Sequence, residues 1–167
     1  MLSLAARALP ALLFLPLVWL FFLSYLEYLE TGAGFGVNPD EAFVKYLGEW
    51  SIRILLVAYS ISPVSRVFAW RTLAKMRRFA GLTAFVYVLL HLTSYVLLYI
   101  ELDWEVLLED VIERKYVVAG FLAFFCLLLM TITSTNGWKK RLGSNWRALH
   151  RLIHIAVSYT HLRAHET

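Results

Sequence analysis

Hydrophobic residues in this chain gather into long runs that are separated by short polar segments. Four runs stand out, at residues 9–26, 43–63, 79–100 and about 116–133. The third run holds 22 residues without a charge, which would form about 33 Å of helix and could cross a bilayer. A fifth helix is expected to begin near Trp146. The pattern therefore predicts helices of membrane-spanning length rather than strands.

Composition strengthens this interpretation, because 60% of the residues are hydrophobic, more than a soluble domain carries. We predict an all-α, polytopic transmembrane helix bundle with about five spans, the last one incomplete. The first run is expected to be an uncleaved spanning helix, since it is longer than the hydrophobic part of a signal peptide and no small-residue cleavage site follows it. Pro63 is expected to end the second helix.

Basic and acidic residues lie in different segments of the chain. Residues 63–78 and 136–151 each hold five basic residues and no acid, whereas eleven of the twelve acids lie in 27–49 and 101–115. The positive-inside rule places the two basic segments in the cytoplasm. The predicted topology therefore has a cytoplasmic N-terminus, with the two acidic segments on the opposite side of the membrane.

The connections between the runs have different characters. Residues 31–39 are expected to form a glycine-rich loop whose glycine spacing does not fit a dinucleotide-binding motif. Residues 66–78 and 136–147 are expected to be basic loops. The segment 101–115 is acidic and partly amphipathic, and its flanking aromatic residues, Trp104 and Tyr116, are typical of anchors at a membrane interface.

Histidines are the candidate functional residues. His91 lies just past the middle of the third run, while His150 and His154 are four apart and share a face of the fifth helix. A histidine inside a membrane is costly without a partner, so His91 is either a functional residue or a structural one bonded to a neighbouring carbonyl or hydroxyl. A zinc site would need a third ligand, which is missing, and haem is the better fit to apolar helices.

Helix rise gives the expected depths of these histidines. Measured from the cytoplasmic ends of their helices, His91 lies about 18 Å deep, His150 about 6 Å and His154 about 12 Å. Axial ligands of one haem must lie at similar depths, so the spacing indicates two sites, one shallow and one deep. Covalent haem attachment is not expected, because no Cys-x-x-Cys-His stretch occurs and Cys126 is the only cysteine.

Cationic residues could bind the propionate groups of a haem. The candidates are Arg77, Arg78, Arg147 and Arg151, for which contact with lipid headgroups is the alternative. Arg53 lies four residues after Glu49, so it either pairs with that carboxylate or meets a haem propionate.

Several motifs, in this order, resemble one known family. They are Arg77-Arg78-x-x-Gly81-Leu82, His91-Leu92-Thr93-Ser94-Tyr95, Thr133-Ser134-Thr135 and Leu142-Gly143-x-x-Trp146-x-x-Leu149-His150-Arg151. Over about residues 10–157 the chain resembles the MsrQ (formerly YedZ) family of haem-binding membrane subunits. That family belongs to the ferric-reductase-like transmembrane group, with the NADPH oxidases.

The resemblance implies a multi-pass protein of the bacterial inner membrane with about six helices, b-type haem and FMN. It implies electron transfer from a quinone or a cytosolic flavin reductase to a periplasmic molybdopterin enzyme of the MsrP type, which reduces methionine sulfoxide. The family's haem histidines correspond to His91 and His150, which would be the metal ligands. A third family histidine corresponds to Arg163 here.

The end of the chain departs from the family. Residues 158–167 are too polar to finish a membrane crossing and are expected to be a foreign tail, so the haem-binding domain is residues 1–157. The sequence carries no nucleotide-binding motif and no nucleophile–base pair, which favours an electron carrier over a catalytic subunit. A ferric-chelate reductase-like haem protein and a non-redox membrane assembly protein are the alternatives, and no nucleic acid partner is expected.

Overall fold

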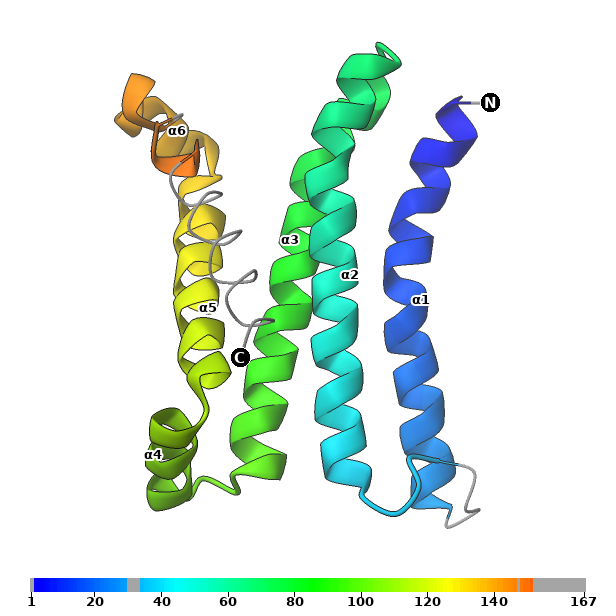
Figure 1. Cartoon of the computed structure of the whole chain (residues 1–167). Coiled ribbons are helices and arrows are strands. Elements are labelled where there is room, and N and C mark those ends of the chain that lie inside the picture. Colours follow the sequence, from blue (N-terminus) through cyan, green and yellow to red (C-terminus); the bar gives the residue numbers. More distant parts are fainter. Residues whose placement is uncertain (1, 30–33, 147, 152–167) are drawn as a thin grey trace. The chain divides into compact units, whose positions relative to one another are not determined.

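The computed structural model describes residues 2–29, 34–146 and 148–151, and all regular structure in these ranges is helical. The elements are α1 (Leu2–Tyr28), α2 (Pro39–Val67), α3 (Arg71–Ser94), the π-helix η1 (Tyr95–Tyr99), α4 (Trp104–Glu113), α5 (Lys115–Thr133) and α6 (Asn136–Leu142) (Figure 1). The chain divides into two compact units, Met1–Glu101 and Leu102–Thr167. Each unit is described by itself.

Three of the described helices are long and apolar enough to cross a membrane. Their apolar segments are Ala8–Tyr28, Met76–Tyr99 and Lys115–Thr133. They match the first, third and fourth hydrophobic runs, so these three predictions are confirmed at the level of helix length and composition. The second run lies in α2, which has 29 residues but carries charges in its first half. A membrane crossing by α2 stays a prediction.

Helices α2 and α3 pack along each other, and α1 joins them in the first unit (Figure 1). Small side chains let the helices approach closely, since Ala80 and Ala84 of α3 are fully buried. The core residues of this unit are Leu13, Leu20, Leu47, Ile54, Ala58, Ile61, Ala80, Ala84 and Tyr87. The core therefore lies where the three helices meet, and large apolar side chains of α1 remain exposed on its outer side.

Two tyrosine hydroxyls form hydrogen bonds that join α1 to α2 and α3. The buried Tyr87 of α3 donates to the carbonyl of Leu13 at 2.8 Å, and Tyr46 of α2 donates to the carbonyl of Pro16 at 3.0 Å. Leu13 and Pro16 are three residues apart and so share one face of α1. Pro16 lies inside the helix, where a proline leaves one helical hydrogen bond unmade. The two hydroxyls therefore bind the backbone close to Pro16, where α1 lacks one of its own hydrogen bonds.

The ends of the α2–α3 connection differ from the prediction. Pro63 does not end α2, which continues for one more turn to Val67. A proline lacks its own N–H bond to the previous turn, but the residues after it can still donate, so the helix continues. The predicted basic loop at 66–78 was also wrong, because α3 begins at Arg71. The true connection is residues 68–70, where Ala69 takes a positive φ of 52°.

The second unit begins with α4. Asp103 caps this helix by accepting hydrogen bonds from the backbone N–H groups of Glu105 at 2.8 Å and Val106 at 3.4 Å. Asp110 pairs with Arg114 at 3.2 Å near the helix end. The segment predicted as acidic and amphipathic is therefore a true helix that leads directly into α5.

The second predicted basic loop, at 136–147, is also largely helical. It contains α6 (Asn136–Leu142), which ends at Gly143 with a φ of 52°. Residues 144–146 and 148–151 are helical again, so the fifth helix begins near Trp146 as expected. The predicted foreign tail, His154, His161 and Arg163 lie outside the described residues.

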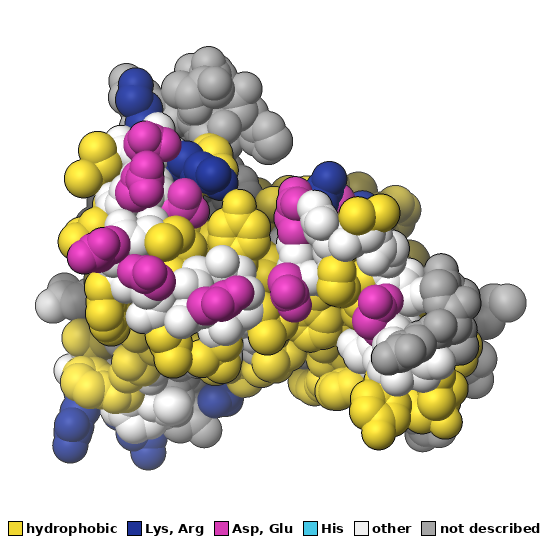
Figure 2. All heavy atoms as spheres, turned by 90° about the horizontal axis from the view of Figure 1, so that it is seen from below, with side chains coloured by type: hydrophobic (Ala, Val, Ile, Leu, Met, Phe, Trp, Pro, Cys, Tyr) yellow, Lys and Arg dark blue, Asp and Glu magenta, His cyan; other side chains and the backbone are white. Residues whose placement is uncertain are grey.

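Acidic side chains gather at one end of the helices in each unit. In the view of Figure 2, Asp and Glu side chains lie among apolar ones. In the first unit, the α1–α2 connection lies at this end, while the α2–α3 connection lies at the opposite end with the start of α1 (Figure 1). The charge separation seen in the sequence is thus a separation in space within that unit.

Candidate functional site

His91 lies near the end of α3 and faces α2. Its Nδ1 is 2.9 Å from the carbonyl oxygen of Val44. A carbonyl only accepts hydrogen bonds, so Nδ1 must carry the proton. The remaining nitrogen, Nε2, then keeps its lone pair, which is the form of imidazole that binds a metal. The contact joins residues 47 positions apart in the chain, and sequence patterns gave no sign of it.

The backbone around His91 is also satisfied. The hydroxyl of Ser94 donates to the His91 carbonyl at 2.9 Å, and Ser51 donates to the Gly48 carbonyl at 2.7 Å on the facing helix. The π-helix η1 begins at Tyr95, whose carbonyl accepts the bond from the N–H of Ile100, five residues later, at 2.9 Å. Such wide turns are frequent at functional sites. The backbone near the imidazole is therefore hydrogen-bonded on both α3 and α2.

The hydrogen bond of His91 to Val44 is compatible with a metal-ligand role. Histidines that bind metals commonly donate their other N–H to a backbone carbonyl, which fixes the ring orientation and raises the basicity of the ligand nitrogen. The Val44 carbonyl supplies this bond. The two interpretations left open by the sequence, a ligand or a histidine bonded to a carbonyl, are thus compatible with one another.

His150 belongs to the second unit and is held through its other nitrogen. Its Nε2 lies 3.0 Å from Oγ1 of Thr133 at the end of α5. The Thr133 hydroxyl donates to the Leu129 carbonyl at 2.7 Å, so it accepts from His150 and Nε2 carries the proton. Binding a metal through Nε2 would require this contact to break. His150 therefore fits a haem less directly than His91 does.

Trp146 completes the setting of His150. The two rings are 4.1 Å apart between centroids and tilted by 32°, and the indole N–H donates to the Thr133 carbonyl at 2.8 Å. The ammonium of Lys139 lies 5.1 Å from the Trp146 ring centroid. Thr133 and Trp146 were singled out as motif positions, but their direct contacts with His150 were not foreseen.

The candidate arginines are only partly brought near the histidines. Arg77 and Arg78 are exposed near the start of α3, about 20 Å along the helix axis from His91. They lie at the shallow end of the predicted bundle. Arg151 is exposed and directly follows His150 in the chain. Arg77 and Arg78 therefore do not lie beside His91.

Arg53 is occupied by other partners. Its guanidinium forms an ion pair with Glu49 at 2.8 Å and lies 5.0 Å from the Trp50 ring centroid. Of the interpretations that the sequence left open for Arg53, the structure shows the pairing with Glu49. Arg147 lies outside the described residues.

No group of three or more His, Cys, Asp or Glu side chains that could hold a metal ion occurs within the described ranges. Cys126 is half-buried in α5 and has a free thiol.

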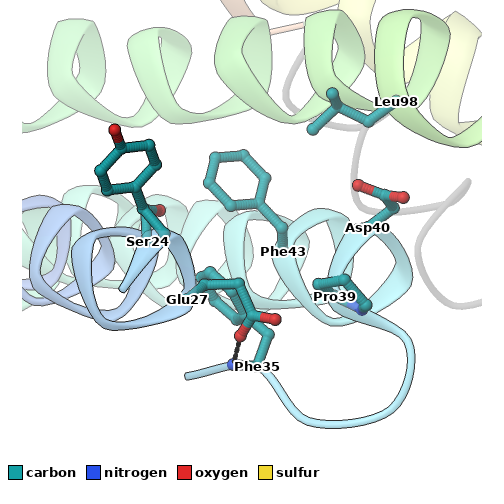
Figure 3. Close-up of a pocket in the computed structure, with 8 residues that line it drawn as sticks. Ser24, Glu27, Phe35, Pro39, Asp40, Phe43 and Leu98 are labelled. Atoms are coloured by element: carbon teal, nitrogen blue, oxygen red, sulfur yellow. Dashed lines mark hydrogen bonds between the residues drawn. The ribbon is translucent and has the colours of Figure 1, made fainter. Parts of the chain in front are cut away.

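A shallow groove of about 240 Å³ opens at the acidic end of the first unit. Figure 3 shows Phe43 and Leu98 on its apolar side, and Glu27 accepting a hydrogen bond from the Phe35 N–H at 2.8 Å. The lining residues are Ser24, Glu27, Tyr28, Phe35, Pro39, Asp40, Phe43 and Leu98. They include no histidine or arginine, so this groove is separate from the candidate haem residues.

Comparisons with known proteins give consistent matches. The family described as ferric reductase like transmembrane component matches residues 47–160. The protein-methionine-sulfoxide reductase heme-binding subunit MsrQ of Caulobacter vibrioides is 40% identical over 145 residues, covering 86% of this chain and 66% of that protein. The subunit of the same name from Rhodospirillum rubrum is 39% identical over 144 residues, with the same coverage.

A more distant relative is the magnetosome protein MamZ of Magnetospirillum gryphiswaldense, 34% identical over 142 residues, covering 84% of this chain and 22% of that protein. The chain spans about two thirds of the length of the two MsrQ relatives. No solved structure gives a significant match.

Proposed function

Because the chain belongs to the ferric reductase like transmembrane component family, we propose that it is a haem-binding electron-transfer subunit of the bacterial inner membrane. The observation that carries the proposal is the hydrogen bond between His91 Nδ1 and the Val44 carbonyl, 2.9 Å long. It fixes the tautomer in which Nε2 can bind iron. Membership of a transmembrane family and three helices of spanning length support the membrane location.

The residues of this chain have separate roles in the proposal. His91 would hold a haem at the deeper site, and His150 would hold one at the shallower site if its Nε2 were released from Thr133. Arg77, Arg78 and Arg151 bind carboxylate groups at the shallow level. Haem b, when bound, supplies a one-electron carrier whose potential depends on its ligands and on the dryness of its site.

The proposed electron acceptor follows from the names of the relatives. Both MsrQ relatives are called heme-binding subunits of a protein-methionine-sulfoxide reductase. We therefore propose that this chain passes electrons to a periplasmic molybdopterin reductase of the MsrP type. A quinone or a cytosolic flavin reductase as the donor, and FMN as a second cofactor, stay predictions from the family resemblance.

A ferric-chelate reductase-like haem protein is the second candidate, favoured by the description of the matching family. The two functions differ in the electron acceptor. In membranes that contain the chemically reduced protein, the haem spectrum should return to the oxidised form on addition of the methionine sulfoxide reductase and a sulfoxide substrate. A spectrum that responds only to ferric chelates would replace the first proposal by the second.

The haem assignment is tested by substitution. The His91→Ala and His150→Ala proteins, purified in detergent from a haem-sufficient host, should each contain less haem than the unchanged protein, because each loses an iron ligand at its depth. His154→Ala serves as the control and should have a smaller effect. Unchanged haem content in both variants would favour a non-redox membrane protein in which these histidines are structural.

A further inference from the structure

Gly48 of α2 lies directly against the His91 imidazole. A Cβ atom added to Gly48 would lie 2.9 Å from Cε1 and 3.2 Å from Nδ1 of His91. Real Cβ atoms do not approach other heavy atoms to within 3.0 Å. Gly81 and Gly120, which also lie inside long helices, have nothing within 4 Å of an added Cβ. The contact at Gly48 is therefore specific to the histidine and is not shared by these two helical glycines.

Helix geometry links this contact to the hydrogen bond at Val44. Gly48 follows Val44 by four residues, so the two lie one turn apart on the same face of α2. A helical side chain leans toward the N-terminus and covers the turn that precedes it. Any side chain at position 48 would thus extend over the Val44 carbonyl. The missing side chain leaves that oxygen open to Nδ1 of His91.

Glycine at position 48 destabilises the helix relative to alanine, so its presence there needs an explanation. In the middle of a helix, glycine is less favourable than alanine by roughly 0.5–1 kcal/mol. Gly48 lies well inside the 29-residue helix α2, where backbone flexibility serves no turn or cap. Its close approach to the imidazole is the feature of the surrounding structure that an alanine would disturb.

We propose that Gly48 is a positioning residue for the proposed haem ligand His91. It opens the Val44 carbonyl to the imidazole, and the carbonyl holds the ring with Nε2 available to iron. This inference rests on the proposed haem-binding function. It adds a residue that touches no haem itself and acts only through the orientation of His91.

The test compares four variants with the unchanged haem-loaded protein: Gly48→Ala, His91→Ala, the double variant and Gly81→Ala as the matched control. Two quantities are measured in each, the rate at which haem transfers to an excess of apomyoglobin and the electron paramagnetic resonance g-values of the ferric form. Gel filtration establishes that each variant remains monodisperse.

We expect Gly48→Ala to weaken haem retention roughly 10-fold and to shift the g-values, because changes to the hydrogen-bond partner of a metal ligand typically have effects of this size. Gly81→Ala should match the unchanged protein. In the double variant, Gly48→Ala should add nothing to the loss caused by His91→Ala, since its effect passes through that side chain.

The outcomes separate this inference from the proposed function. If His91→Ala loses haem but Gly48→Ala behaves like Gly81→Ala, the positioning role is wrong and the ligand assignment stands. If His91→Ala keeps all its haem, both are wrong.

A measurement without substitution covers the case in which Gly48→Ala does not fold. In the unchanged protein placed in D₂O, pulsed electron–nuclear resonance should detect the Nδ1 proton of the ligand long after exposed imidazoles have exchanged. Exchange as fast as that of an exposed imidazole would contradict the bond to Val44 and overturn the proposal.

Discussion

The two candidate histidines are held by opposite nitrogens, and this difference decides how each one can react. His91 is bonded through Nδ1 to a backbone carbonyl, which no substitution of the partner residue removes. His150 is bonded through Nε2 to the Thr133 hydroxyl, a side chain that can rotate away. His91 is therefore fixed with its Nε2 unprotonated, while His150 is held in the alternative tautomer.

The Thr133 contact predicts a local stability effect. Thr133→Val removes the acceptor for His150 and should loosen residues 144–151 by about 1 kcal/mol. Hydrogen exchange of the backbone amides in that segment should then be roughly fivefold faster. Thr133→Ser, which keeps the hydroxyl, is the control. Equal exchange rates in the valine and serine variants would show that the hydrogen bond does not hold the segment.

A second residue-scale prediction concerns the contact between α1 and α3. Tyr87→Phe removes the 2.8 Å hydrogen bond that this fully buried tyrosine donates to the Leu13 carbonyl. We expect the free energy of unfolding to fall by about 0.5–1 kcal/mol. Thermal unfolding in detergent measures the change. Tyr25→Phe, at an exposed position of α1, should leave the transition unchanged.

Residue types predicted which side chains to examine but not how they are held. The resemblance to the MsrQ family, drawn from motifs that include His91 and His150, is confirmed by relatives up to 40% identical. The partners Val44 and Gly48 could not be predicted from the sequence, because they are ordinary apolar residues of another helix. Only the packing of α2 on α3 shows that Gly48 lacks a side chain next to the carbonyl that Val44 offers to His91.

At the scale of elements, α4 combines two different exposed faces. Trp104, Leu108 and Ile112 are spaced by four residues and are 71%, 60% and 79% exposed. Glu105, Glu109 and Glu113 form a parallel exposed row. Since α4 leads directly into α5, a helix of membrane-spanning length, we expect it to lie in the membrane interface with its apolar row toward lipid.

Spin labels test this placement. Cys126 is the only cysteine, so Cys126→Ser provides a background for single labels. A label at Ile112→Cys should be relaxed mainly by oxygen, which concentrates in lipid, and a label at Glu109→Cys mainly by a water-soluble nickel chelate. Equal responses at the two positions would contradict an interfacial helix.

Helix centres were predicted better than helix ends. The apolar runs located α1, α3 and α5, because lipid-facing helices need continuous apolar length. The ends were misjudged where local signals compete. The sequence predicts a helix end at Pro63 and a basic loop at residues 66–78. Charged residues at the end of a membrane helix, however, can extend into the headgroup region without unwinding it.

At the scale of the whole molecule, the charges predict orientation. Reporter fusions at Gly36 and Leu108 should report a periplasmic location, and fusions at Leu73 and Gly143 a cytoplasmic one, because basic segments stay in the cytoplasm. The α1–α2 connection, which holds Gly36, and the start of α3, which holds Leu73, lie at opposite ends of the first unit, so this pair is the most direct comparison. A periplasmic signal at Leu73 would invert the topology.

The π-helix at Tyr95–Tyr99 also bears on how such chains change length during evolution. A π turn holds one residue more than an α turn, so losing a single residue there would restore an ordinary α-helix. His91 lies before the turn, and its bond to Val44 would be unaffected. A one-residue deletion within an ordinary α-helix, by contrast, would rotate everything after it by about 100° around the helix axis. Homologues should therefore tolerate one-residue deletions between positions 95 and 99 more readily than between 79 and 91.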